Sequence, residues 1–422
     1  MSDAASLKRD AADAIDAMAG DLLAISHAIH AKPELAFEEY EAARLLTAKL
    51  EHEGLPVARE AYGLPTAYAS EFGRADAPQV AILSEYDALP GVGHACGHNI
   101  IATTGLGAAL ALSKLGARLP GRIRYLGTPA EEKGGGKEIM AQAGAFDRVD
   151  AAMMVHPSGI DLATMPCICI SEVVATYHGR TSHASAMPHA GINALDAAVT
   201  AYQSLAQLRQ HIRQSERLHG IITKGGVAPN VVPELAEVYF FVRAANAGDL
   251  AQLKKRVIAC LEAGALATGC TVDIQWAQVD YLDMKTSWSL AGAYEKNMNA
   301  LGRSLFPMEK VPSSSAGSTD MGNVSHRVPS IHPMIASAPP NVIIHNPEFA
   351  RWAASEMGDK ACIDGAKALA MTAIDYLADE ALRATAAREF AATADVSTKA
   401  VATAFTAHGS AEIGGCGCGA CA

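Results

Sequence analysis

Three short apolar runs in the first 160 residues each end in polar side chains, and this pattern limits the folds that the chain can adopt. The runs are 80–87, 122–128 and 151–156, and the segments 102–116 and 137–146 between them have small and apolar residues at helical spacing. Strands that alternate with helices predict a parallel sheet. Ligands of such sheets bind beyond the carboxyl ends of the strands. The three polar ends therefore predict one shared site.

Acids and a histidine occupy these three strand ends. Glu85 and Asp87 end the first run, Glu131 and Glu132 follow the second, and His156 ends the third. Two adjacent acids before a glycine turn more often form a solvated loop, because burying them requires a cation or a proton. Since the next strand ends in a histidine, we interpret the acid pair as part of a site.

A second cluster lies between the first two runs, in the segment HACGHN. Cys96 and His98 are two residues apart at the start of a predicted helix, so both side chains can point into one cleft. Thiolate and imidazole are good ligands for zinc, cobalt, nickel or manganese. On its own such a pair is at least as often structural, and it gains weight only together with the acids and His156.

This combination of residues is suited to hydrolysis. One carboxylate of the pair can bind a metal while its neighbour takes a proton from metal-bound water, whose pKa the metal lowers, and later protonates the leaving nitrogen. The glycine clusters match neither a P-loop nor a dinucleotide fingerprint. Ser182 and Ser185 lack the spacing of a serine hydrolase elbow, so we interpret them as turn residues.

The chain changes character after residue 172. A strand, a long helix, two strands about a Gly/Pro turn, a second helix and a last strand follow one another up to residue 287. This order predicts a split βαβ sandwich inserted into the first domain. The predicted divisions are 1–172 and 288–390 for the main domain, 173–287 for the insertion, and 391–422 for a flexible tail rich in Gly and Cys.

Charge and composition limit the kinds of molecule that the protein is expected to bind. The net charge of -11 is spread without a basic stripe, which argues against nucleic acid and favours a small-molecule substrate. No run of about 18 apolar residues is present, and the N-terminal segment is typical of an amphipathic helix rather than a signal peptide. We therefore expect a cytoplasmic protein without membrane contact. The nine cysteines do not follow a disulfide pattern, and Cys260, Cys270 and Cys362 are interpreted as core residues.

Six ordered motifs resemble the aminoacylase and carboxypeptidase G superfamily of metallopeptidases. They are SEYDALPGVGHACGHN, TPAEEKGGGK, MVHP, GRTSHASAMPHAGINALDAAV, HGIITKGGVAPNVVPE and GSTDMGNVS, followed by a late histidine in IIHNPEF. The likeness runs from about residue 20 to 385 and fits best the aminoacylase-like dipeptidase (amidohydrolase) branch. It implies an α/β catalytic domain of the zinc-peptidase kind with a mixed sheet. It also implies an inserted α+β, ferredoxin-like lid that forms a homodimer.

The resemblance assigns a role to each motif residue. One or two divalent metals (zinc, manganese, cobalt or nickel) would be held by Cys96, His98, Glu132, His156 and His345. Glu131 matches the general acid and base, and Asp87 matches the acid beside the metals. His183 matches the lid histidine that reaches the reacting carbonyl, often in the partner subunit. Asn230 and Arg243 match lid positions that hold a substrate carboxylate.

Two departures from the family pattern bear on the substrate and on the number of metals. The segment 330–349 is apolar and contains the proline pair Pro339–Pro340 where dipeptidase-like relatives are more polar, so the pocket wall is expected to differ. Position 99 is Asn where many relatives have Asp, which would lower the charge near a second metal and permit a single one. Asp320 is as easily a loop cap as a site residue, whereas for His183 and Arg243 we favour a functional role over a structural one.

Three functions remain open at this point. The first is hydrolysis of the amide of an N-acyl amino acid or a dipeptide-like substrate with a carboxylate. The second, prompted by the apolar wall, is release of ammonia from a carboxylated aromatic amine, as in nitroanthranilate aminohydrolase, with the same ligands and base. The third is a non-catalytic binding protein on the same fold. The presence of Glu131 and of every matched ligand argues against this third function.

Overall fold

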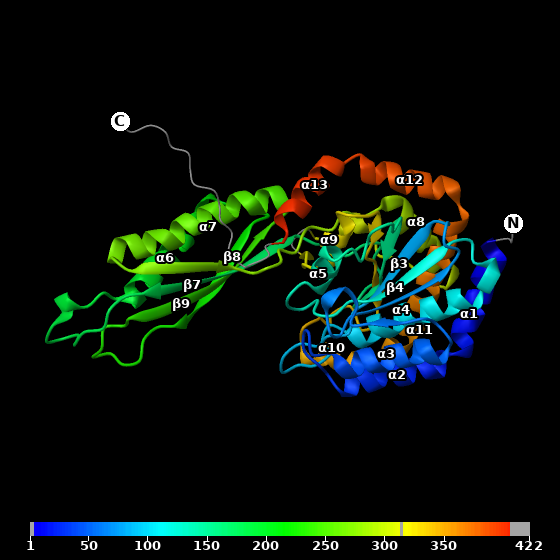
Figure 1. Cartoon of the computed structure of the whole chain (residues 1–422), viewed down its shortest axis with the longest axis horizontal. Coiled ribbons are helices and arrows are strands. Elements are labelled where there is room, and N and C mark those ends of the chain that lie inside the picture. The colour runs from blue at the N-terminus through cyan, green and yellow to red at the C-terminus, as the bar shows by residue number, and fades with distance from the viewer. Residues whose placement is uncertain (1–3, 313–314, 406–422) are drawn as a thin grey trace. The chain divides into compact units, whose positions relative to one another are not determined.

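A computed structural model describes residues 4–312 and 315–405, and the chain divides into two compact units (Figure 1). Unit 1 comprises Met1–Cys167 and Leu282–Val401. Unit 2 comprises Ile168–Tyr281 together with the described residues after Val401. No helix in the described ranges is long and apolar enough to cross a membrane.

Unit 1 is built on a mixed sheet of six strands in the order β1-β2-β4-β3-β5-β11. The pairs β4/β3, β3/β5 and β5/β11 are parallel, and β1/β2 and β2/β4 are antiparallel. The strands are β1 (Ala58–Arg59), β2 (Tyr68–Gly73), β3 (Gln79–Ser84), β4 (Arg122–Gly127), β5 (Ala151–Met153) and β11 (Ser330–Ile331). A separate parallel pair is formed by β6 (His156–Ser158) and β12 (Met334–Ala336).

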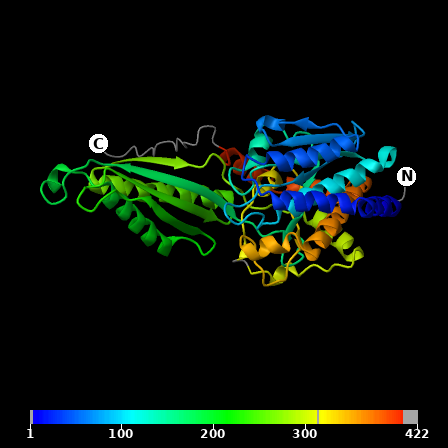
Figure 2. The same cartoon turned by 90° about the horizontal axis from the view of Figure 1, so that it is seen from below.

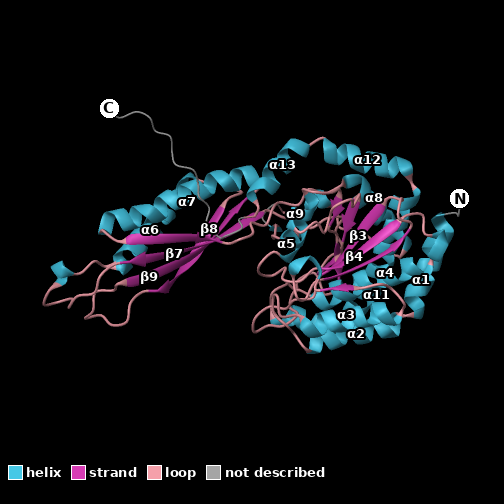
Figure 3. Ribbon diagram, in the orientation of Figure 1, coloured by secondary structure: helices cyan, strands magenta, loops and turns pink. Residues whose placement is uncertain are grey.

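Helices cover this sheet, as the ribbon colours of Figure 3 show. Outside the inserted unit they are α1 (Ala4–Ala17), α2 (Ala19–Ala31), α3 (Tyr40–His52), α4 (His98–Lys114), α5 (Gly136–Gln142), α8 (Trp288–Ala300), α9 (Met321–Ser325), α10 (Pro347–Trp352), α11 (Glu356–Ala378), α12 (Glu380–Ala391) and α13 (Ala394–Thr403). Short 3-10 turns lie at Ala61–Gly63, Gly116–Arg118, Pro188–Ala190, Arg209–His211 and Met308–Lys310.

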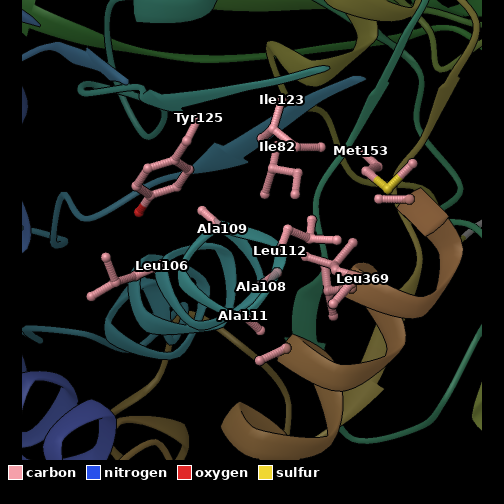
Figure 4. Close-up of a cluster of buried hydrophobic side chains, with 14 of the residues drawn as sticks. Ile82, Leu106, Ala108, Ala109, Ala111, Leu112, Ile123, Tyr125, Met153 and Leu369 are labelled. Atoms are coloured by element: carbon pink, nitrogen blue, oxygen red, sulfur yellow. The ribbon is translucent and has the colours of Figure 1, made fainter. Parts of the chain in front are cut away.

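The central strand β3 is buried on both faces, as expected for a parallel strand with helices on each side. Val80 and Ile82 belong to a core cluster that includes residues of α4 and α11, part of which Figure 4 shows. Ala81 and Leu83 belong to a second cluster that includes residues of α5 and α9. Because successive side chains of a strand point to opposite faces, this alternation fixes the position of β3 between two helical layers.

Helix α4 lies close to β3 because Gly105 has no side chain. A Cβ added at Gly105 would lie 2.3 Å from Ser84 Oγ and 3.0 Å from Leu83 O. Ser84 Oγ also donates a hydrogen bond to Ala102 O at 2.9 Å. The helix is therefore joined to the last residue of β3, directly before Glu85.

Unit 2 is an α+β sandwich with one covered sheet face, which Figure 2 shows from below. Its antiparallel sheet has the order β10-β7-β9-β8. The elements follow in the order β7 (Cys169–His178), α6 (Ala194–Leu208), β8 (Arg217–Lys224), β9 (Leu235–Ala244), α7 (Ala247–Thr268) and β10 (Thr271–Trp276). This βαββαβ order is the ferredoxin-like one. The predicted fold class, a mixed-sheet α/β domain with an inserted α+β unit, is confirmed.

The C-terminal segment differs in part from the predicted flexible tail. Residues 394–403 form helix α13, and Ser397 of this helix is buried. Its hydroxyl accepts a hydrogen bond from Lys285 Nζ at 2.9 Å and lies 3.2 Å from His326 Nδ1. These contacts hold in place a stretch that its composition alone predicted to be flexible. The Gly- and Cys-rich stretch 409–422 lies outside the described residues.

Two glycine substitutions test the close approach of α4. Gly105→Ala should lower the free energy of unfolding by about 1–3 kcal/mol, because its Cβ overlaps Ser84 and Leu83. The control Gly292→Ala, in α8, meets no atom within 4 Å and should raise the same quantity by about 0.5–1 kcal/mol. Urea unfolding followed by circular dichroism measures both. Equal effects of the two substitutions would show that the contact is unimportant.

Candidate metal centre

The strand ends of unit 1 bring together the acids and histidines that the sequence singled out. In the register of the sheet, Ser84 of β3 lies opposite Gly127 of β4, so Glu85 and the loop with Glu131 start at the same edge. Strand β5 runs parallel on the other side of β3 and leads to His156. Three groups of possible ligands have their atoms within 4.8 Å of one another: Cys96, His98 and His156; Cys96, Glu132 and His345; and Glu85, His98 and Glu131.

His98 is at the centre of this cluster and is fully buried. Its Nδ1 lies 3.0 Å from Asp87 Oδ1. A carboxylate can only accept, so Nδ1 carries the proton, and in the neutral ring Nε2 presents a lone pair. Nε2 faces carboxylate oxygens of Glu85 at 3.6 Å, Glu131 at 3.8 Å and Glu132 at 3.8 Å. An imidazole whose second nitrogen is held by a carboxylate is the usual arrangement of a metal-binding histidine.

Cys96 and His156 form the adjacent part of the cluster. Cys96 Sγ lies 3.3 Å from His156 Nε2, and the His156 Nδ1 proton is donated to Pro157 O at 2.8 Å. Burial lowers the pKa of His156 to about 3, so its Nε2 is unprotonated. Gly97, at the N-cap of α4, has φ +76°, and a Cβ there would lie 2.6 Å from Pro157 Cγ. Only glycine therefore fits between the two candidate ligands on either side of it.

Glu132 and His345 complete the cluster. The backbone nitrogen of Glu132 donates to Asp87 Oδ2 at 2.9 Å, so Asp87 holds both His98 and Glu132. Glu132 Oε1 lies 3.6 Å from His345 Nε2. His345 is half exposed, has φ +68°, and is anchored by its backbone nitrogen, which donates to Ala95 O at 2.8 Å.

The chemistry of the donor set fits divalent cations. Among the described residues, Glu85 Oε2, His98 Nε2 and Glu132 Oε1 are buried without a hydrogen-bond partner. Burial, followed by repulsion from Glu85 and Glu132, raises the pKa of Glu131 well above its usual range. Lone pairs and negative charges that face one another in a dry interior are costly unless a cation lies between them. The cluster therefore has the composition and the orientation of a metal site.

Glu39 supports the loop that carries the acid pair. It is fully buried, and its Oε1 accepts from the backbone nitrogens of Phe37 at 3.0 Å and Ala130 at 2.8 Å, while Oε2 accepts from Thr66 Oγ1 at 2.7 Å. Ala130 has φ +61°, a conformation that costs a non-glycine residue about 1 kcal/mol or more. Glu39 thus holds the residue before Glu131 in a strained conformation. Burial and the nearby Asp87 raise the pKa of Glu39 to about 7.

Sequence reasoning missed several residues around the cluster. Glu39 gave no signal, because Thr66 and Ala130, which it joins, are distant in the sequence. His332 follows the short strand β11 and is fully buried beside His156, with ring centroids 5.6 Å apart. Within the described ranges neither of its ring nitrogens has a hydrogen-bond partner. The strand-end rule that found His156 would have found His332 if the run 330–349 had not been read as apolar.

The three predicted lid residues lie in unit 2. His183 forms an antiparallel bridge with Val231, and Ala184 N donates to Asn230 O at 3.0 Å, so His183 and Asn230 are on adjacent loops. His183 Nδ1 accepts from backbone nitrogens at 3.2 and 3.3 Å, which leaves its proton on the exposed Nε2. Arg243 lies on β9, where its Nε donates to His219 Nε2 at 3.3 Å.

Comparisons with known proteins identify the family. The Xaa-Arg dipeptidase of Mus musculus is 43% identical over 398 residues, which cover 91% of this chain and 92% of that protein. A model of the peptidase dimerisation domain of M20 proteins matches residues 170–268. The chain belongs to the M20 family of metallopeptidases.

Further M20 relatives agree. The Xaa-Arg dipeptidase of Homo sapiens is 41% identical over 88% of this chain and 89% of that protein. The solved structure of a dinuclear metal-binding peptidase of the M20 family from Bacillus subtilis shares the fold, with a TM-score of 0.65 and 22% identity over 86% of this chain and 99% of that one. The predicted resemblance to the aminoacylase-like dipeptidase branch is confirmed. This M20 protein is a metal-dependent hydrolase of amide bonds that uses a divalent metal and carries a dimerisation domain.

The pH dependence of folding tests the role of Glu39. The folded chain holds its pKa near 7 against the ordinary value of 4.5, so between these values the folded state binds more protons than the unfolded state. The resulting stability is present below about pH 4.5 and is lost as the pH rises through 7, by about 3 kcal/mol in total. Glu39→Gln does not titrate, so its urea midpoint relative to wild type should rise between about pH 5 and 8. Parallel pH profiles would contradict this assignment.

Proposed function

We propose that this M20 protein is a dipeptidase that releases a C-terminal arginine or a similar basic residue from a dipeptide. The observation that carries the proposal is the 43% identity to the mouse Xaa-Arg dipeptidase over 91% of this chain and 92% of that one. The metal centre supports it, because it combines candidate ligands with a second buried carboxylate. The similarity to two dipeptidases favours this reaction over the release of ammonia from a carboxylated aromatic amine.

Five side chains would hold the metal: Cys96, His98, Glu132, His156 and His345. The lone pairs of His98 Nε2 and His156 Nε2 support this assignment, as does the orientation of Glu132 Oε1 towards both His98 and His345. Thiolate and imidazole donors suit zinc, cobalt, nickel or manganese. Several buried carboxylates in the same cluster favour two cations over one. Such cations polarise a carbonyl group and make a bound water more acidic.

Glu131 would act as the general base and acid. It lies next to Glu132 in sequence, and its Oε2 is 3.8 Å from His98 Nε2, so it borders the ligands. A raised pKa brings its proton affinity closer to neutrality, which suits a group that takes a proton from water and returns it to the leaving nitrogen. Asp87 would keep His98 and Glu132 in place during this exchange, because it accepts hydrogen bonds from both.

The lid residues would recognise the substrate. His183, with its proton on Nε2, would donate to the oxygen of the scissile carbonyl as negative charge develops there. Asn230 and Arg243 would bind the C-terminal carboxylate, for which a guanidinium is the best partner. The assignment rests on the family motifs that these residues match.

A homodimer would form through unit 2. Strand β8 is at one edge of the sheet and pairs with β9 on one side. Ile221 and Ile222 of this strand are 60% and 40% exposed. An edge strand with exposed apolar side chains is a site for association with a second copy.

A small-molecule substrate remains the expected binding partner of the metal centre. The cytoplasmic location stays a prediction.

Product analysis tests the proposed reaction. The metal-loaded protein is incubated with dipeptides that end in arginine, lysine, leucine or glutamate, with N-acyl amino acids, and with aminobenzoates, and products are identified by mass spectrometry. We expect free arginine and lysine to be released fastest. Preferred cleavage of N-acyl amino acids would reject the basic-dipeptide specificity, and ammonia from the aminobenzoates alone would favour the alternative reaction.

A Glu131→Gln variant tests the base. Gln keeps the size of the side chain but cannot take a proton, so kcat should fall by about 10²–10⁴-fold. Bound metal, measured on the same sample, should stay at the wild-type ratio because Glu132 supplies the ligand. An unchanged kcat would remove Glu131 from this role, and a loss of metal would place it among the ligands.

A further inference from the structure

A buried network of three charged side chains lies beside the metal centre and is not used by the proposed mechanism. Lys137 Nζ contacts the carboxylate of Glu85 and lies 2.6 Å from Asp320 Oδ1. Asp320 Oδ2 also accepts a hydrogen bond from the backbone nitrogen of Lys137 at 2.9 Å. All three side chains are fully buried. Asp320 thus binds Lys137 at two points, and Lys137 in turn fixes one oxygen of Glu85.

The second oxygen of Glu85 faces the metal centre. Glu85 Oε2 is 3.6 Å from His98 Nε2, and in the described part of the chain neither atom has a hydrogen-bond partner. A separation of 3.6 Å is too long for a direct hydrogen bond. Two bonds of about 2.1 Å to one cation, at an angle near 110–120°, separate a nitrogen and an oxygen by about 3.4–3.6 Å. The observed separation fits two ligands of one metal.

The charge of the cluster leads to the same conclusion. Five carboxylates, whose side chains are at most one-tenth exposed, lie in this cluster. Glu85, Asp87, Glu131 and Glu132 face the ring of His98, and Glu85 and Asp320 contact the ammonium group of Lys137. Lys137 offsets one of these charges. The remaining carboxylates require cations or protons, and Glu85 Oε2 is a carboxylate oxygen placed where a cation would bind.

Position 99 does not supply this charge. The Asn99 amide nitrogen donates to Ser26 Oγ and to Ala353 O, both at 2.9 Å, so it ties the start of α4 to α2 and to the end of α10. Asn99 therefore has a structural contact at the position where many relatives have an acid. The carboxylate of Glu85 lies next to His98 instead.

We propose that Glu85 is an additional metal ligand of this centre, and that Lys137, anchored by Asp320, is the positioning residue that aims its free oxygen at the cation. The inference rests on the proposed metal centre and extends it beyond the five ligands that the family motifs assign. It also gives Asp320 a role that the sequence left open, as the anchor of the lysine.

Metal titration of matched variants tests the proposal. The metal-free forms of wild type, Glu85→Gln, Glu85→Asp and the control Glu138→Gln are titrated with Zn²⁺ against a competing chelator, and folding is checked by circular dichroism. Glu138 is a suitable control because it is buried on the same helix as Lys137 and pairs with Arg327 instead. The absorption spectrum of the Co²⁺-loaded forms reports the ligand geometry without any measurement of activity.

The two variants at position 85 separate ligation from general charge. Gln removes the charge, and Asp keeps it but withdraws the carboxylate by one methylene from His98. We expect both to lose on the order of 10- to 100-fold in affinity for one metal equivalent and to change the Co²⁺ spectrum, while Glu138→Gln matches wild type. Wild-type affinity in Glu85→Asp, or in both variants, would overturn the assignment. If wild type itself bound no Zn²⁺, the proposed metal centre would fail, and the role of Glu85 with it.

Discussion

The concentration of buried carboxylates at one edge of the sheet is the constraint on which the rest of unit 1 depends. Glu85, Asp87, Glu131 and Glu132 follow two adjacent parallel strands and are almost fully buried, and one ammonium group, that of Lys137, cannot balance them. A chain that collected these groups without cations would be destabilised by several kcal/mol for each uncompensated charge. The fold is therefore linked to metal binding, and any loss of metal should also affect stability.

Hydrogen bonds and two glycines fix the positions of the candidate ligands. Asp87 accepts a hydrogen bond from the ring of His98 and another from the backbone of Glu132, so one carboxylate sets the position of two candidate ligands. Gly97 allows Cys96 and His98 to stand on either side of a left-handed turn. Gly105 brings α4 close to the end of β3. Each of these contacts involves only a few residues, but each depends on the register of the sheet strands that bring those residues together.

The sequence predicted the parts of the site that follow strand ends, because strand periodicity and parallel connection are local signals. The acid pairs and His156 were found in this way, and strand and helix signals gave the βαββαβ order of the insertion. Cys96 and His98 were found instead as two possible ligands at the start of a predicted helix. Contacts between distant segments could not be found. Lys137 and Asp320 are 183 residues apart, and no local pattern pairs them. His332 was missed for a different reason, since the prolines and several aliphatic residues gave its segment an apolar character.

The proposed roles of the two adjacent acids differ because of their surroundings rather than their chemistry. The backbone of Glu132 is fixed by Asp87, and its free oxygen lies between His98 and His345, so a shared cation can satisfy all three. Burial raises the pKa of Glu131, and repulsion from the nearby charge of Glu85 raises it further. If Glu85 ligates a metal, part of its charge is withdrawn towards the cation. Because that withdrawal weakens the repulsion on Glu131, the extra ligand would lower the pKa of the base from the level that burial and the charge of Glu85 set together.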